Sequence, residues 1–172
     1  MVISPGVYEV SGADIAEILD EAARQGVPVF ILSTAGRTGR EAFFSAVRAA
    51  LPLDPPLQAV RLVWEALADS LRGGLDALNT PRVVILWPDA RPVAGAEGDF
   101  VIALDILRET VATLADAQYT NGRPTHVCVH IAPAPHHHRQ HPRAIAADST
   151  ASPGSTRSAE VAEWSPATAA SA

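Results

Sequence analysis

The stretch Val63-Trp64-Glu65-Ala66-Leu67-Ala68-Asp69-Ser70-Leu71-Arg72-Gly73 decides how this chain folds. Its apolar residues recur at the i, i+3, i+4, i+7 spacing of an amphipathic helix. The predicted buried face consists of Trp64, Leu67, Ala68, Leu71, Leu75 and Leu78. Glu65 and Asp69 lie one turn apart on another face, where like charges cost an isolated helix a few tenths of a kcal/mol. That face is either a solvated surface, with Arg72 partly neutralising Asp69, or a surface that meets a partner.

Composition limits the classes of protein to consider. A chain of 172 residues with 48% hydrophobic residues buries a core as one domain with a tail, or as two small domains at most. The net charge of −6 falls on residues 1–132, because acidic and basic residues are equal in number after that. An acidic domain argues against nucleic acid and anionic membranes as partners and allows a basic protein partner.

Targeting signals and cysteine usage indicate the compartment. The single cysteine, Cys128, excludes an intramolecular disulfide. No basic segment precedes an apolar run at the amino terminus, and no apolar run approaches the ~20 residues that span a bilayer. We therefore expect a soluble, cytoplasmic protein.

The chain divides into three predicted parts. Residues 1–26 form an extension, with a short edge strand near Gly6–Val10 and a helix from Asp14 that stops at Gly26. Residues 27–132 form the main domain. Residues 133–172 are rich in Pro, Ala, Ser, Thr and His without apolar periodicity, which predicts a disordered tail.

Within residues 27–132, apolar runs predict three strands and the segments between them predict helices. The strands are Val27–Leu32, Arg82–Trp87 (ended by Pro88) and Thr125–Ile131. The helices are Arg40–Ala50, about Leu57–Leu78 with Gly73-Gly74 as a potential interruption, and Phe100–Ala117 capped by Asp99. This order predicts an α/β fold with a small parallel three-stranded sheet and right-handed crossovers.

Four groups of residues are candidates for chemistry. His126, Cys128 and His130 share one strand face, but such faces usually pack under a helix and a fourth metal ligand is not evident. The His136–His138 run with His141 would bind nickel or zinc only loosely. The loop at 33–39 lacks the phosphate-binding glycine patterns, and Ser70 has no histidine to activate it. We therefore expect no catalytic residues, no metal and no cofactor in a protein that is not an enzyme.

The string from Trp64 to Arg72 resembles the signature helix of the barstar family. Trp64, Ala66, Leu67, Asp69 and Leu71 match that family's pattern, and Glu65 stands where an Asp is usual. Upstream, Ala59, Val60, Arg61 and Val63 replace the family's Tyr, aromatic residue, Gly and Asn. The resemblance covers about residues 27–131 and implies a barstar-like fold with helices packed on a parallel three-stranded sheet.

The same resemblance implies a function. In the barstar family this helix and the loop before it block the active site of a small basic ribonuclease, and carboxylates take the place of RNA phosphates. The implied partner-binding residues are Glu65, Asp69, Arg72, Gly73 and Glu109. Arg72 lies where the family's namesake has a small Thr and brings a positive charge to the surface. Two hypotheses remain: an inhibitor of a small ribonuclease, or a binding module for some other basic protein.

Overall fold

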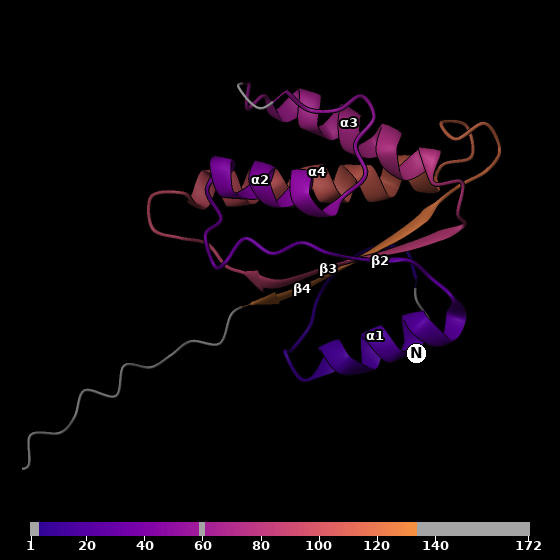
Figure 1. Cartoon of the computed structure of the whole chain (residues 1–172), viewed down its shortest axis with the longest axis horizontal. Coiled ribbons are helices and arrows are strands. Elements are labelled where there is room, and N and C mark those ends of the chain that lie inside the picture. The colour runs from indigo at the N-terminus through magenta and orange to yellow at the C-terminus, as the bar shows by residue number, and fades with distance from the viewer. Residues whose placement is uncertain (1–3, 59–60, 134–172) are drawn as a thin grey trace, which may run out of the picture. The chain divides into compact units, whose positions relative to one another are not determined.

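The computed structural model describes residues 4–58 and 61–133 and contains a parallel four-stranded sheet of order β1-β4-β3-β2, shown in Figure 1. Strands and helices are joined in an α/β order. The elements are β1 (Gly6–Glu9), α1 (Asp14–Gln25), β2 (Val29–Ile31), α2 (Arg40–Ala50), α3 (Trp64–Ala77), β3 (Arg82–Ala90), α4 (Glu97–Ala115) and β4 (His126–Pro133). Within the described residues, no helix combines the length and the apolar character needed to cross a membrane.

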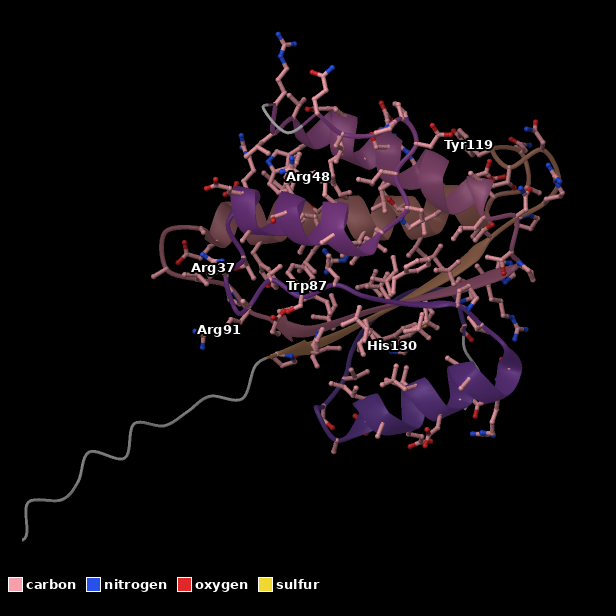
Figure 2. The ribbon with its side chains drawn as sticks, in the orientation of Figure 1. Arg37, Arg48, Trp87, Arg91, Tyr119 and His130 are labelled. Atoms are coloured by element: carbon pink, nitrogen blue, oxygen red, sulfur yellow. The ribbon has the colours of Figure 1, made fainter. Side chains whose placement is uncertain are left out.

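The central strands β3 and β4 are apolar on both sides because helices cover both faces of the sheet. Alternate residues face a large core formed with α2, α3 and α4, and Val83, Ile85, Trp87, Val127 and Val129 belong to it. On the other face, Val84 and Cys128 pack against Ile18 and Ala22 of α1. Figures 1 and 2 show this division, with Trp87 on the side of α2 and His130 on the side of α1.

Helix α3 forms an outer layer over α4 and α2 (Figure 1). Leu67, Leu71 and Leu75 are fully buried, as the periodicity predicts. Each such side chain contributes roughly 1.5–3 kcal/mol through burial, which is why tertiary packing rather than helix propensity holds α3 in place. The prediction for Leu78 is wrong, because it lies just beyond the helix and is 38% exposed.

The predicted three-stranded sheet is corrected to four strands. β1 pairs in parallel with β4, with Val7 opposite Val129, because β4 would otherwise present an unpaired edge. The short edge strand and the helix expected in the amino-terminal segment are both present. Helix α1 ends at Gly26, whose φ of 64° is the left-handed conformation that glycine adopts most readily.

Helix α3 begins later than predicted, and the predicted interruption within it is absent. It begins at Trp64, because Val63 is extended, and Leu57 and Leu62 pack on the core outside the helix. Gly73 and Gly74 do not interrupt it. A Cβ on Gly73 would lie 2.1 Å from the Asp54 carbonyl oxygen, so the glycines allow the loop around Asp54 to lie directly against α3.

Two further boundaries are corrected. β3 continues through Pro88 to Ala90, and the register is irregular between Trp87 and Ala90, where a proline without an N–H is tolerated. Asp99 does not cap its own helix, because α4 already begins at Glu97. Its carboxylate accepts a hydrogen bond from the Arg40 N–H at 2.9 Å and so caps α2 instead. The tail expected at 133–172 lies outside the described residues from 134 onward.

Candidate functional site

An open groove of about 390 Å³ lies between helices α3 and α4, and most of the predicted partner-binding residues line it. Glu65, Asp69 and Arg72 line the groove from α3, where they occupy positions i, i+4 and i+7. Glu109 contributes from α4, where Ile102 and Ile106 complete the same i, i+4, i+7 stripe. Trp64 and Ala68 complete the lining. One stripe from each helix therefore builds the groove.

Arg72 is the centre of this groove. Its guanidinium pairs with Asp69 one turn earlier and, at 2.9 Å, with Glu109 on the other helix. The hydrogen bond with Asp69, helped by Glu109, raises the pKa of Arg72 above its usual value. The two carboxylates are 70% and 63% exposed, so these pairs contribute only about 0–1 kcal/mol each to stability. Arg72 therefore arranges the carboxylates more than it stabilises the fold.

The groove combines an apolar floor with an acidic rim. Ala68 and Ile106 are buried at its base, and Ile102 is 37% exposed at its side. The lining holds three carboxylates and one guanidinium, so it carries a net charge of −2. Apolar residues surrounded by charged ones are typical of surfaces that bind proteins. The groove can therefore form charge-assisted hydrogen bonds with cationic groups while covering apolar surface.

Trp64 is held at the start of α3 by aromatic packing. Its ring lies 5.0 Å from that of Phe44 and 6.0 Å from that of Phe43, both on α2. The Arg40 guanidinium lies 5.4 Å from the centre of the indole, within cation–π range. The indole Nε1 is buried and has no hydrogen-bond partner among the described residues. These contacts fix the position of Glu65, the next residue.

The structure brings together Glu65, Asp69, Arg72 and Glu109, but not Gly73. Gly73 contacts the loop around Asp54 and does not line the groove. Ile102 and Ile106 also line the groove and were not predicted from the sequence. Their i, i+4, i+7 spacing with Glu109 is a signal that would have identified them.

The loop at the carboxyl end of β2 is closed by Asp89. This carboxylate accepts hydrogen bonds from Ser33 Oγ, Thr34 N–H, Thr34 Oγ1 and Gly36 N–H, at 2.9–3.2 Å. Burial raises the pKa of Asp89, but these hydrogen bonds together outweigh burial and hold it below the usual value. The donors that would hold a phosphate in such a loop are occupied by a carboxylate.

Cys128 and His130 form a buried pair beneath α1. Cys128 Sγ lies 3.2 Å from His130 Nε2, and the imidazole stacks on Tyr8 with ring centres 5.9 Å apart. Burial raises the pKa of the Cys128 thiol to about 11 and lowers the pKa of His130. Both groups are therefore uncharged near pH 7. In the described part of the chain, no three His, Cys, Asp or Glu side chains are grouped to hold a metal ion, and His136–His138 and His141 lie outside that part.

Comparisons with known proteins found no matching family model, no matching curated protein and no matching solved structure.

Proposed function

We propose that this protein inhibits a small basic ribonuclease by placing the α3–α4 groove over the enzyme's active site. The observation that carries the proposal is the gathering of Glu65, Asp69 and Glu109 on one surface with a net charge of −2. A ribonuclease active site holds RNA phosphates with cationic side chains. Carboxylates gathered on one surface take the place of those phosphates and form charge-assisted hydrogen bonds.

The resemblance of α3 to the barstar signature helix supports the same proposal. The element order from β2 to β4 is strand, helix, helix, strand, helix, strand, which is the order expected for a barstar-like fold. In this proposal the protein is a binding protein without a catalytic step of its own. Its acidic surface attracts a basic enzyme over a distance, so association slows as salt concentration rises.

A second function is favoured by one specific observation. Arg72 already pairs with Asp69 and Glu109, and it presents a positive charge to any basic partner. A barstar-fold binding module whose partner is a different basic protein would keep the groove and have no ribonuclease to inhibit. The two functions differ in whether removing Arg72 improves binding to a ribonuclease.

The test is inhibition of a small basic ribonuclease of the barnase type by the unmodified protein and four variants. Asp69→Ala is expected to weaken inhibition by at least ~2 kcal/mol, about 30-fold, because cationic groups of the enzyme lose their counter-charge. Glu65→Ala is expected to cost less, since Glu has one more rotatable bond to order. Arg72→Thr is expected to tighten the complex by removing a repelling charge.

Asp105→Ala is the matched control, because Asp105 is an exposed carboxylate on α4 that pairs with Arg108 and lies outside the groove. It should leave inhibition within about twofold of the unmodified protein. Circular dichroism confirms that each variant is folded. If neither the unmodified protein nor Arg72→Thr inhibits at high concentration and low salt, the binding module replaces the inhibitor. If Asp69→Ala inhibits as strongly as the unmodified protein, the groove is not the binding surface.

A further inference from the structure

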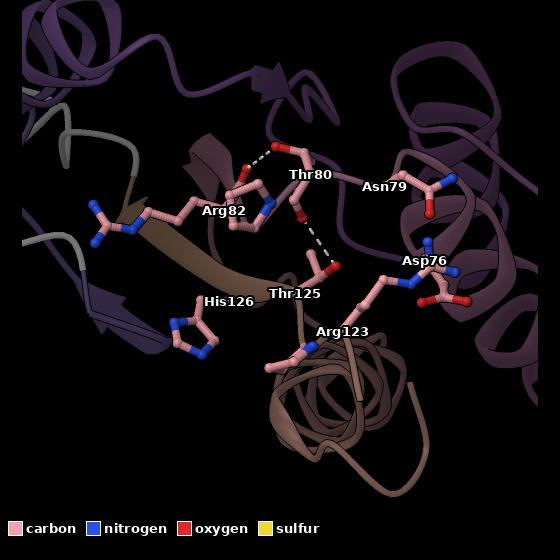
Figure 3. A pocket seen from close by; sticks show the side chains of 9 residues that line it. Asp76, Asn79, Thr80, Arg82, Arg123, Thr125 and His126 are labelled. Carbon is pink, nitrogen blue, oxygen red and sulfur yellow. Dashed lines mark hydrogen bonds between the residues drawn. The ribbon is translucent and has the colours of Figure 1, made fainter. Parts of the chain in front are cut away.

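A second cavity of about 510 Å³ lies at the amino ends of β3 and β4, beside the end of α3 (Figure 3). It shares no lining residue with the α3–α4 groove. Its volume falls within the usual range for sites that bind small molecules. Nine residues line it: Asp76, Asn79, Thr80, Pro81, Arg82, Arg123, Pro124, Thr125 and His126.

The charge of this cavity is opposite to that of the whole chain. The chain carries a net charge of −6, whereas the cavity holds two arginines, Arg82 and Arg123, against one carboxylate, Asp76. Within residues 4–58 and 61–133, neither arginine forms an ion pair. Arg82 Nη1 donates to Gln25 Oε1 at 3.0 Å, which is a neutral acceptor. The lining therefore carries a net positive charge, because it holds two guanidinium groups and one carboxylate.

Strand register makes two of the lining residues neighbours in the sheet. Arg82 is the first residue of β3, His126 is the first residue of β4, and they are direct partners in the parallel ladder. Neighbouring strands are about 4.8 Å apart, so the two side chains start close together at the amino ends of the strands. An anion bound there would accept a charge-assisted hydrogen bond from the guanidinium and a second hydrogen bond from an imidazole N–H.

The walls of the cavity are already fixed by hydrogen bonds. The buried Thr125 donates from Oγ1 to the Thr80 carbonyl at 3.0 Å, and Thr80 donates from Oγ1 to the Arg82 carbonyl at 3.2 Å. The His126 N–H donates to the Pro81 carbonyl at 2.9 Å. A ligand would not have to order this backbone on binding, which reduces the entropy cost of association.

We propose that this cavity binds a small phosphate monoester, with the phosphate between Arg82 and His126 and the organic part extending toward Arg123 and Asn79. In Figure 3, Thr80 and Thr125 lie between these two ends of the cavity. A guanidinium fork matches phosphate oxygens in two parallel hydrogen bonds, and the two arginines of the lining attract an anion. Asp76 and Asn79 offer acceptors for hydroxyl groups on the organic part.

The experiment titrates the full chain with ribose 5-phosphate, inorganic phosphate and succinate. Binding is followed by calorimetry and by the imidazole NMR signals of His126, with those of His130 as an internal reference. We expect saturable binding of the monoester in the millimolar range or tighter, with His126 shifting and His130 unchanged. Inorganic phosphate should bind at least fivefold more weakly, because it lacks the part that reaches Arg123.

The variants are Arg82→Gln and Arg123→Gln, with Arg37→Gln as the matched control. All three arginines are exposed, and Arg37 lines a different hollow beside α2. Arg82→Gln should weaken monoester binding at least tenfold, and Arg37→Gln should leave it within twofold. The proposal is overturned if the monoester does not saturate the His126 shift by 20 mM, or if Arg37→Gln weakens binding as much as both cavity variants. It is also overturned if succinate binds as tightly as the monoester.

Discussion

Gly73→Ala tests whether the groove helix is shaped by the loop that lies against it. Gly73 is in the middle of α3, where alanine is ordinarily the more stable residue by roughly 0.5–1 kcal/mol. In this fold, however, the new Cβ would lie 2.1 Å from the Asp54 carbonyl oxygen and 3.2 Å from its carbonyl carbon. The atoms in the way belong to the backbone, so no side-chain rotation relieves the clash.

The expected loss follows from these contacts. The loop must move by more than 1 Å to restore ordinary contact, and overpacking of this kind typically costs about 1–3 kcal/mol. The movement also breaks the hydrogen bond from the Asp54 N–H to the Ser70 carbonyl, 2.9 Å long, which contributes about 1 kcal/mol. After subtracting the gain in helix propensity, the net destabilisation is about 1–3 kcal/mol. For a chain of this size that lowers Tm by roughly 3–10 °C.

The assay is urea unfolding followed by circular dichroism, with thermal melts as a second measurement. Gly98→Ala is the matched control, because Gly98 also lies in a helix and nothing is within 4 Å of a Cβ placed there. It should leave stability unchanged or raise it by up to ~1 kcal/mol. If Gly73→Ala unfolds at the same urea concentration as Gly98→Ala or higher, the packing of the Asp54 loop on α3 is not as described.

Three further predictions test the core and the buried pair beneath α1. Leu71→Ala should lower the free energy of unfolding in urea by roughly 2–5 kcal/mol, because Leu71 is fully buried. Glu65→Ala, on the exposed face of the same helix, should change it by no more than about 0.5 kcal/mol. Equal losses in the two variants would contradict the assigned faces. Burial lowers the pKa of His130 in the folded protein, so as pH falls the unfolded chain binds a proton at this residue more readily than the folded protein does. The free energy of unfolding should therefore decrease as pH drops below about 6.5, and His130→Phe should reduce this dependence on pH. Burial raises the pKa of the Cys128 thiol to about 11, so at pH 8 the thiol should react with a disulfide reagent at least a hundredfold more slowly in the folded protein than in the urea-unfolded chain. Rapid labelling of the folded protein would refute the burial of Cys128.

Helix bounds and helix faces were predicted well from the sequence, because helix and strand periods depend on the backbone geometry of residues close together in the chain. The bounds of Arg40–Ala50 match α2, and its buried residues Phe43, Phe44 and Val47 follow from the 3.6-residue period. The stripe of Glu65, Asp69 and Arg72 follows from the same period. The part of the candidate site that lies on α3 was therefore predictable from the sequence.

Contacts between distant residues were decided by tertiary structure. The ion pair of Arg72 with Glu109 spans 37 residues, and the cap that Asp99 provides for α2 spans 59. Neither leaves a periodic signal, because each depends on which helices pack together and at what angle.

The sequence alone determined an α/β chain, most of its helical faces and one acidic stripe. The tertiary structure alone decided that β1 joins the sheet beside β4, that Gly73 and Gly74 admit a loop against α3, and that Arg82 and His126 are partners in the parallel ladder. The physical reason is the range of the interactions. Periodicity reflects the backbone geometry of neighbouring residues, whereas strand order and close approach depend on burial shared between segments that meet only in the folded chain.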